Sequence, residues 1–219
     1  MQVTAANTTC GSIEVPSKGY RLDFSIEKDS SMLVLLPGFT LGGNQVLEAG
    51  IKVTSKYPVQ VVQVTDVGLL DSLKGMHTWP RDCVISEATA ISPVLASQSN
   101  YMVNGPNFKL ADERERQMHF WAYAIDDSTR LGMRLNTTSF NGVPIDTFFY
   151  KDLDEGDVYY LFSQASMPPA PLDWGRSFSG SDVIGLNEPI LLFAGTPSWV
   201  WGRFCVNNVS DFLGGARNL

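Results

Sequence analysis

Charge is scarce in this 219-residue chain. Charged residues make up 18% of it, with 16 Lys and Arg against 23 Asp and Glu, so the net charge is −7. The few cations are scattered singly along the sequence. Proteins that bind nucleic acid usually carry a clustered basic face. Direct contact with nucleic acid is therefore not expected of this chain.

Long apolar runs and helical periodicity are also missing. No window approaches 18 consecutive apolar residues, which excludes a membrane-spanning helix, and the first ten residues are too polar for a signal peptide. Short helices are expected only at residues 66–75 and 111–117. A fold with alternating strands and helices is disfavoured, because its crossover helices need about ten residues or more.

Cysteine is too sparse for a metal or disulfide framework. No two cysteines have the CxxC spacing of such sites, and the three are Cys10, Cys83 and Cys205. Three buried thiols in a reducing compartment are the favoured interpretation, and one disulfide with a free thiol is the alternative. Sequons for N-glycosylation, which matter only in a secreted chain, occur at Asn7, Asn136 and Asn208.

Short β-strand patterns, in contrast, fill the sequence. It contains 12 Phe, 7 Tyr and 5 Trp, and 19 Gly and 12 Pro supply turns between the apolar runs. These runs predict about eleven strands. The expected strands are residues 20–26, 32–36, 45–53, 59–65, 83–85, 118–125, 131–135, 148–150, 158–163, 189–194 and 200–209.

The connections between these strands indicate the fold class. Residues 20–26 and 32–36 flank a polar turn and are expected to pair as a hairpin. A second hairpin is expected around residues 151–157, where Gly156 can adopt a positive φ. Residues 166–174 hold three prolines in four positions, so they form an extended surface connection of the kind that Greek-key folds need.

We therefore predict an all-β protein. The expected architecture is an antiparallel β-sandwich, in the form of an eight-stranded jelly roll with one or two short helices. No repeat or low-complexity linker divides the sequence, so residues 1–219 are expected to form a single domain.

Few residues here are suited to catalysis. His119 alternates with Trp121 and Tyr123 on one face of a predicted strand, which favours a packed histidine over a general base. His77 lies in a loop without a nucleophile motif. Residues 33–43 look superficially like the oxyanion-hole segment of α/β-hydrolases, but no G-x-S-x-G elbow and no G-K-[ST] phosphate motif follows. We expect no enzyme activity and no cofactor.

Acidic residues cluster in the loop at residues 151–157. The cluster consists of Asp152, Asp154, Glu155 and Asp157. Counted from its first aspartate, Gly156 comes one position too early for an EF-hand and the twelfth position is Ser163, so a solvated hairpin tip is the better interpretation. At a subunit contact these acids could still share a calcium ion with a neighbour, and the pair Asp126-Asp127 is the other candidate.

Tryptophan offers a different kind of site. Trp199 and Trp201 fall on one face of a predicted strand, and Trp79 and Trp174 lie near prolines. Exposed tryptophans of this kind serve as sugar-stacking platforms or as anchors in protein interfaces. Ordinary packing in the core or at a sheet edge is the alternative.

The C-terminal region carries two adjacent strand patterns. Residues 201–212 (WGRFCVNNVSDF) alternate in polarity, and an apolar run at residues 190–194 follows Asn187-Glu188-Pro189. Gly195-Thr196-Pro197 separates the two. This arrangement resembles the last two strands of the jelly-roll coat proteins of non-enveloped icosahedral viruses.

The resemblance implies a structural subunit of an icosahedral capsid. Its partners would be other capsid subunits, in a homo- or hetero-oligomeric shell, and it would be found in the virion after assembly in the host cell cytoplasm. Many such coats hold their genome with an Arg-rich N-terminal arm, which this sequence lacks. Either the chain belongs with polyprotein-derived coats that have no arm, or the arm lies outside this sequence, or the family is a different one.

Composition fits assembly, and it also leaves an alternative. Interface cores are depleted in charge and enriched in aromatic residues, as this chain is. A β-sandwich carbohydrate-binding module or lectin, with exposed Trp and Asn/Asp loops, is the second hypothesis. A non-viral assembling or pore-forming β-protein is the third.

Overall fold

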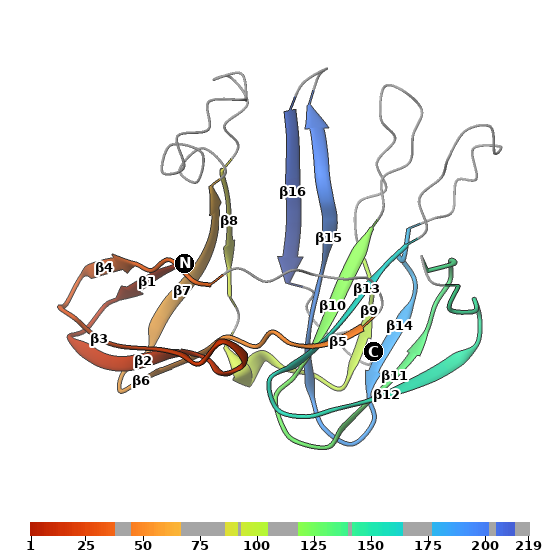
Figure 1. Cartoon of the computed structure of the whole chain (residues 1–219), viewed down its shortest axis with the longest axis horizontal. Helices are drawn as coiled ribbons and strands as arrows, with labels where there is room; N and C mark the ends of the chain where they lie inside the picture. The colour runs from red at the N-terminus through yellow and green to blue at the C-terminus, as the bar shows by residue number, and fades with distance from the viewer. Residues whose placement is uncertain are drawn as a thin grey trace.

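The computed structural model describes residues 1–37, 45–66, 86–91, 93–104, 118–139, 142–163, 177–201 and 205–212. Within these ranges the strands form four antiparallel sheets (Figure 1). Sheet A has the order β4-β1-β7-β8, sheet B β3-β2-β6, sheet C β16-β15-β10-β13-β5 and sheet D β12-β11-β14-β9. The all-β class is confirmed, and the sheets are consistent with the predicted sandwich.

The first two sheets come from the N-terminal part of the chain. Their strands are β1 (Gln2–Ala5), β2 (Thr9–Val15), β3 (Tyr20–Ile26), β4 (Ser30–Leu33), β6 (Lys52–Ser55), β7 (Val59–Asp66) and β8 (Ser86–Ala90). The strands of sheets C and D are β5 (Gln45–Glu48), β9 (Asn100–Met102), β10 (His119–Ala124), β11 (Thr129–Arg134), β12 (Phe148–Leu153), β13 (Asp157–Phe162), β14 (Asp182–Gly185), β15 (Ile190–Trp201) and β16 (Cys205–Phe212).

Helix is limited, in the described part of the chain, to two 3-10 turns, η1 (Pro16–Lys18) and η3 (Val94–Ala96). Neither is long or apolar enough to cross a membrane. Of the two expected helices, residues 111–117 and residues 67–75 lie outside the described ranges, while Asp66 ends strand β7.

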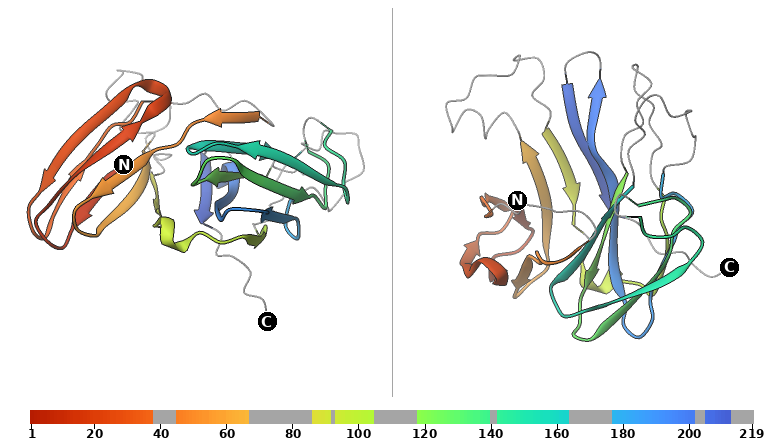
Figure 2. Two further views of the ribbon diagram at one scale, coloured as in Figure 1. Left: turned by 90° about the horizontal axis from the view of Figure 1, so that it is seen from below. Right: turned by 45° about the vertical axis from the view of Figure 1, so that its right-hand side comes forward.

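Sheets A and B pack against each other as the N-terminal sandwich, and sheets C and D form the C-terminal sandwich (Figures 1 and 2). Strand alternation produces each core. In β1, Val3 and Ala5 are buried against Ile13 of sheet B. In β10, Phe120 and Ala122 are fully buried against sheet D.

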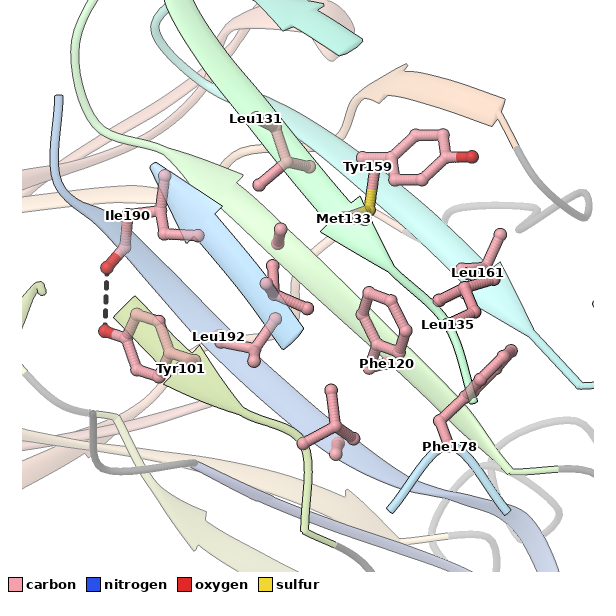
Figure 3. Close-up of a cluster of buried hydrophobic side chains, with 14 of the residues drawn as sticks. Tyr101, Phe120, Leu131, Met133, Leu135, Tyr159, Leu161, Phe178, Ile190 and Leu192 are labelled. Atoms are coloured by element: carbon pink, nitrogen blue, oxygen red, sulfur yellow. Dashed lines mark hydrogen bonds between the residues drawn. The ribbon is translucent and has the colours of Figure 1, made fainter. Parts of the chain in front are cut away.

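The larger core lies in the C-terminal sandwich (Figure 3). Its labelled members are Tyr101, Phe120, Leu131, Met133, Leu135, Tyr159, Leu161, Phe178, Ile190 and Leu192. The Tyr101 hydroxyl is satisfied within this core, because it donates to the Ile190 carbonyl at 2.8 Å and accepts from the Gln98 amide at 3.1 Å. The Phe120 and Phe178 rings meet edge to face, with centroids 5.1 Å apart.

The two sandwiches repeat one strand order. The order β4-β1-β7-β8 in sheet A recurs as β13-β10-β15-β16 in sheet C, and β3-β2-β6 in sheet B recurs as β12-β11-β14 in sheet D. The registers agree as well. In sheet A, Val3 of β1 lies opposite Met32 and Val61 on the two neighbouring strands. In sheet C, Ala122 of β10 lies opposite Tyr159 and Leu192 in the same way.

Contacts outside the ladders repeat too. The Lys56 amide donates to the Cys10 carbonyl at 2.9 Å. At the equivalent position of the C-terminal sandwich, the Leu186 amide donates to the Arg130 carbonyl at 2.8 Å. A buried threonine begins each of the equivalent strands β2 and β11, and a proline precedes each of β7 and β15: these are Thr9 and Thr129, and Pro58 and Pro189. The structure thus contains an internal repeat that the sequence did not indicate.

Strand β5 links the repeats. It follows β4 in the chain but pairs with β13 of the C-terminal sandwich, as Figures 1 and 2 show. The Gly50 amide then donates to the Gly156 carbonyl at 3.0 Å, and Lys52 pairs with Glu155 at 2.6 Å. Since each sandwich has its own core and yet shares this strand, a single domain over residues 1–219 stays a prediction.

Strand positions were predicted better than strand partners. Seven expected strands match observed ones to within three residues at each end, those at 20–26, 32–36, 59–65, 118–125, 131–135, 148–150 and 158–163. The strands β1, β2, β8, β9 and β14 were not expected, and residues 83–85 lie outside the described ranges.

Both predicted hairpins are wrong. Strand β3 pairs with β2 and β4 pairs with β1, so the turn between β3 and β4 crosses from one sheet to the other. Strand β12 pairs with β11, whereas β13 pairs with β10 and β5. Gly156 does have φ +87, but its turn is also a corner between sheets. A tight turn suits a corner as well as a hairpin, so turn residues do not select between them.

Two predicted strand boundaries are wrong as well. Residues 45–53 divide into β5 and β6, which belong to different sheets. Residues 200–209 are not one strand, because β15 ends at Trp201 and β16 begins at Cys205, and these two residues face each other across the hairpin. Gly195-Thr196-Pro197 lies inside β15, where a register shift after Thr196 accommodates the proline.

Truncation of either core tests whether the sandwiches unfold together. Phe120→Ala leaves a cavity in the C-terminal core and should lower the free energy of unfolding by about 3–5 kcal/mol, and Ile13→Ala in the N-terminal core should lower it by about 2–5 kcal/mol. Because β5 belongs to both halves, each variant should shift one common calorimetric transition. Two transitions that respond separately to the two variants would contradict the single domain.

Candidate functional site

Sheet C carries an aromatic face on the side away from the core. We define it by His119 and Trp121 of β10, Tyr160 of β13 and Phe193 of β15. These side chains alternate along their strands with core residues such as Phe120. The His119 ring lies 5.0 Å from Trp121 and 5.6 Å from Tyr160, and Trp121 stacks on Phe193 at 5.7 Å.

His119 is a packed histidine within this aromatic face, as the strand pattern predicted. Its side chain is largely buried, with the residue 7% exposed, and its Nδ1 lies 3.3 Å from the Tyr160 hydroxyl. Its Nε2 has no hydrogen-bond partner among the described residues. Burial lowers the pKa of His119 from 6.5 to about 4, because desolvation penalises the imidazolium. The ring is therefore neutral at physiological pH.

Acidic side chains of the 151–157 loop stabilise the corner between β12 and β13. Asp157 accepts the Asp154 amide at 2.9 Å, and Asp127 accepts the Glu155 amide at 3.0 Å. Lys52 donates to Glu155, which raises the pKa of the lysine. These acids are largely exposed, but they lie at a corner between two sheets and not at the predicted hairpin tip.

Metal binding at these acids has no support within one chain. In the described ranges no three His, Cys, Asp or Glu side chains lie close enough together to hold a metal ion. A calcium ion shared by Asp152, Asp154, Asp157 or the Asp126-Asp127 pair with a neighbouring subunit stays a prediction.

A second surface, the outer face of sheet D, was not predicted. Phe148 and Tyr150 of β12 are both about half exposed there. Arg134 lies over the Phe148 ring at 5.8 Å, and Arg130 lies over the Tyr150 ring at 5.2 Å. The alternation of residues 148–151 already placed Phe148 and Tyr150 on one face of the strand. Only tryptophans, however, were predicted as exposed aromatic residues.

The Asp182 carboxylate holds one of these arginines in place. It accepts two hydrogen bonds from Arg134, from Nε at 3.0 Å and from Nη2 at 2.5 Å. Gly132 lies between the two arginines in β11 and opposite Tyr150. The Tyr150 ring and Leu186 lie over this glycine, where a Cβ atom would be 3.4–3.5 Å from them.

Other predicted site residues give no geometry. Those outside the described ranges are His77, Trp79, Cys83, Trp174 and the pair Gly42-Gly43. Trp199, Trp201, Cys205 and Asn208 belong to β15 and β16, but their side chains are not described. Of the remainder, Cys10 is an exposed free thiol, Asn7 is exposed, and the Asn136 amide group hydrogen bonds to Ser179 and Ser181.

No protein-family model, no curated protein and no solved structure matches the chain.

Burial of His119 predicts an acid-sensitive fold. The folded-state pKa of about 4 lies below the ordinary 6.5. The contribution of a neutral His119 to stability is therefore complete above pH 6.5 and is lost as the pH falls toward 4. The loss is about 3 kcal/mol at 1.36 kcal/mol for each pKa unit.

Comparison with His119→Phe isolates this effect. Denaturant unfolding of both proteins at pH 7 and pH 4 should show a smaller acid loss in the variant, since the carboxylates titrate alike in both. An NMR titration that gave His119 a pKa near 6.5 would contradict the buried, neutral ring.

Proposed function

We propose that this chain is a structural subunit of an icosahedral virus capsid, assembling through contacts between copies or with sister subunits. The observation that carries the proposal is the repeated strand order. In each sandwich, two paired strands enclose a hairpin of the opposite sheet: β1 and β4 enclose β2 and β3, and β10 and β13 enclose β11 and β12. Nested crossings of this kind favour Greek keys over a simple meander.

The C-terminal sandwich supports the finer fold proposal. The eight consecutive strands β9 to β16 supply four strands to sheet C and four to sheet D, and β5 adds a fifth to sheet C. We propose that these eight strands form the jelly roll. Jelly rolls are typical of viral capsid and lectin domains.

The contact between the two sandwiches supports an assembling function. Strand β5 leaves one sandwich and extends a sheet of the other, so this type of sandwich already binds another of its kind within the chain. Strands β8 and β16 also lie side by side where sheets A and C meet (Figure 1). Repetition of such contacts between copies is what a closed shell requires.

The proposed setting follows from the same hypothesis. The protein would be part of the virion, after assembly in the cytoplasm of the host cell. The net charge of −7 gives it little capacity to neutralise a packaged genome, so other subunits or segments would hold the nucleic acid.

Particle formation tests the proposal. Negative-stain microscopy of the native preparation should show closed, uniform particles, and analytical ultracentrifugation of the purified chain should show oligomers that grow with concentration. Nuclease treatment should leave the assembly unchanged, since few phosphate contacts are expected. A chain that sediments only as a monomer, from a source without particles, would refute the capsid function.

A carbohydrate-binding module is the second candidate, and the outer face of sheet D favours it. Half-exposed aromatic rings on a shallow sheet surface are the usual stacking partners of sugar rings. Phe148 and Tyr150 are two residues apart on one face, and Arg130 and Arg134 add hydrogen-bond donors beside them.

A glycan array distinguishes the second candidate from the first. If sheet D binds sugar, Tyr150→Ala should reduce the signal about fivefold or more, because stacking on an aromatic ring contributes on the order of 1 kcal/mol or more. Tyr57→Ala, at an exposed tyrosine of the N-terminal sandwich, is the matched control and should have no effect. An array without hits for the native protein would exclude this function.

A further inference from the structure

Beyond β13, sheet C is extended by a strand from the other sandwich, which becomes the last strand of the sheet. Strand β5 pairs with β13 along its whole length, with Gln45 opposite Tyr160 and Glu48 opposite Asp157. The strand comes from the connection between β4 and β6 of the N-terminal sandwich. Within the chain, therefore, one sandwich donates a strand to the sheet edge of the next.

The corresponding edge of sheet A is open. Strand β4 takes the place of β13 in the repeat, since Thr4 faces Ser31 as Tyr123 faces Val158. Among the described residues no strand pairs with β4 on the side away from β1. The difference is visible in side-chain exposure: Leu33 is 60% exposed, whereas Tyr160 at the equivalent position is 8% exposed.

Backbone groups of β4 point into this open edge. Val34 and the N-terminal Met1 exchange hydrogen bonds, at 2.8 and 2.9 Å. Hydrogen-bonded pairs alternate along an antiparallel ladder, so Met32 also points toward β1. The N–H and C=O groups of Ser31 and Leu33 point away from β1, where they are available to a further strand.

Nothing in the sequence of this edge opposes pairing. Natural proteins protect open edges with lysine, proline or inward-pointing charge. Residues 30–36 (SSMLVLL) contain none of these, and Leu35 beside the edge is 61% exposed. An uncharged edge strand flanked by exposed leucines is a template for an added strand.

We propose that the open edge of β4 binds a strand of a second copy of this chain. The two sandwiches are repeats, and the contact at β13 runs head to tail, from the connecting strand of one to the edge of the next. If this head-to-tail contact is repeated, a strand from a further sandwich of this kind pairs with β4. This inference rests on the proposed function, for which it names the subunit contact: a heterologous one, which forms a closed assembly when its rotation closes and an open filament when it does not.

Two edge variants of the full chain test the contact. Leu33→Pro removes an outward-pointing donor without removing a hydrogen bond to β1, and Leu35→Lys places a charge beside the edge. Each should weaken self-association by about tenfold or more in sedimentation, equivalent to about 1.4 kcal/mol per tenfold change. Leu95→Lys, at a leucine of η3 that is 97% exposed, is the matched control and should assemble as the native chain does.

Amide hydrogen exchange gives a second readout that does not depend on a variant's folding. In the assembled protein the Ser31 and Leu33 amides should exchange more slowly than in the dilute monomer. The Met32 amide, which points toward β1, should be protected in both states and serves as the internal control.

The outcomes separate this contact from the capsid function. Particles that form undiminished with both edge variants, and without protection of Ser31 and Leu33, would overturn the edge contact and leave the capsid function standing. Protection conferred by a different protein, and not by a second copy, would overturn the proposed occupant. A native chain that stays monomeric and forms no particles in any preparation would overturn both.

Discussion

The pairing of β5 with β13 is the interaction on which the organisation of this molecule depends. A sheet edge exposes unpaired N–H and C=O groups, and these must meet water or another strand. At β13, sheet C meets this constraint with a strand from the other half of the chain, and that strand, β5, becomes the edge of the sheet. The same pairing brings Gly50 against Gly156 and Lys52 against Glu155, so the corner between β12 and β13 contacts both sandwiches.

Two kinds of aromatic surface result from the sandwich architecture. The aromatic face of sheet C is closely packed around a neutral His119, which makes it a structural feature with a titratable group at its centre. The outer face of sheet D keeps Phe148 and Tyr150 half exposed beneath arginines. Of the two, only the second presents aromatic rings to a ligand or to a neighbouring subunit.

The internal repeat shows how sequence reasoning can miss a duplicated fold. Strand alternation has a period of two residues and tolerates many apolar side chains, so equivalent strands such as β2 and β11 share little more than a leading threonine. The connections differ as well: β2 and β3 are joined by residues 16–19, but β11 and β12 by residues 135–147. Equal registers, visible only in the pairing, reveal the repeat.

The sequence by itself determined the all-β class, the positions of many strands and the faces of their side chains. His119 and Trp121 lie opposite Phe120 and Ala122 because alternation is a local property of extended backbone. Tertiary structure alone decided which strands pair. Partners depend on contacts between residues far apart in the chain, and a tight turn such as that at Gly156 serves a hairpin and a crossing between sheets equally well.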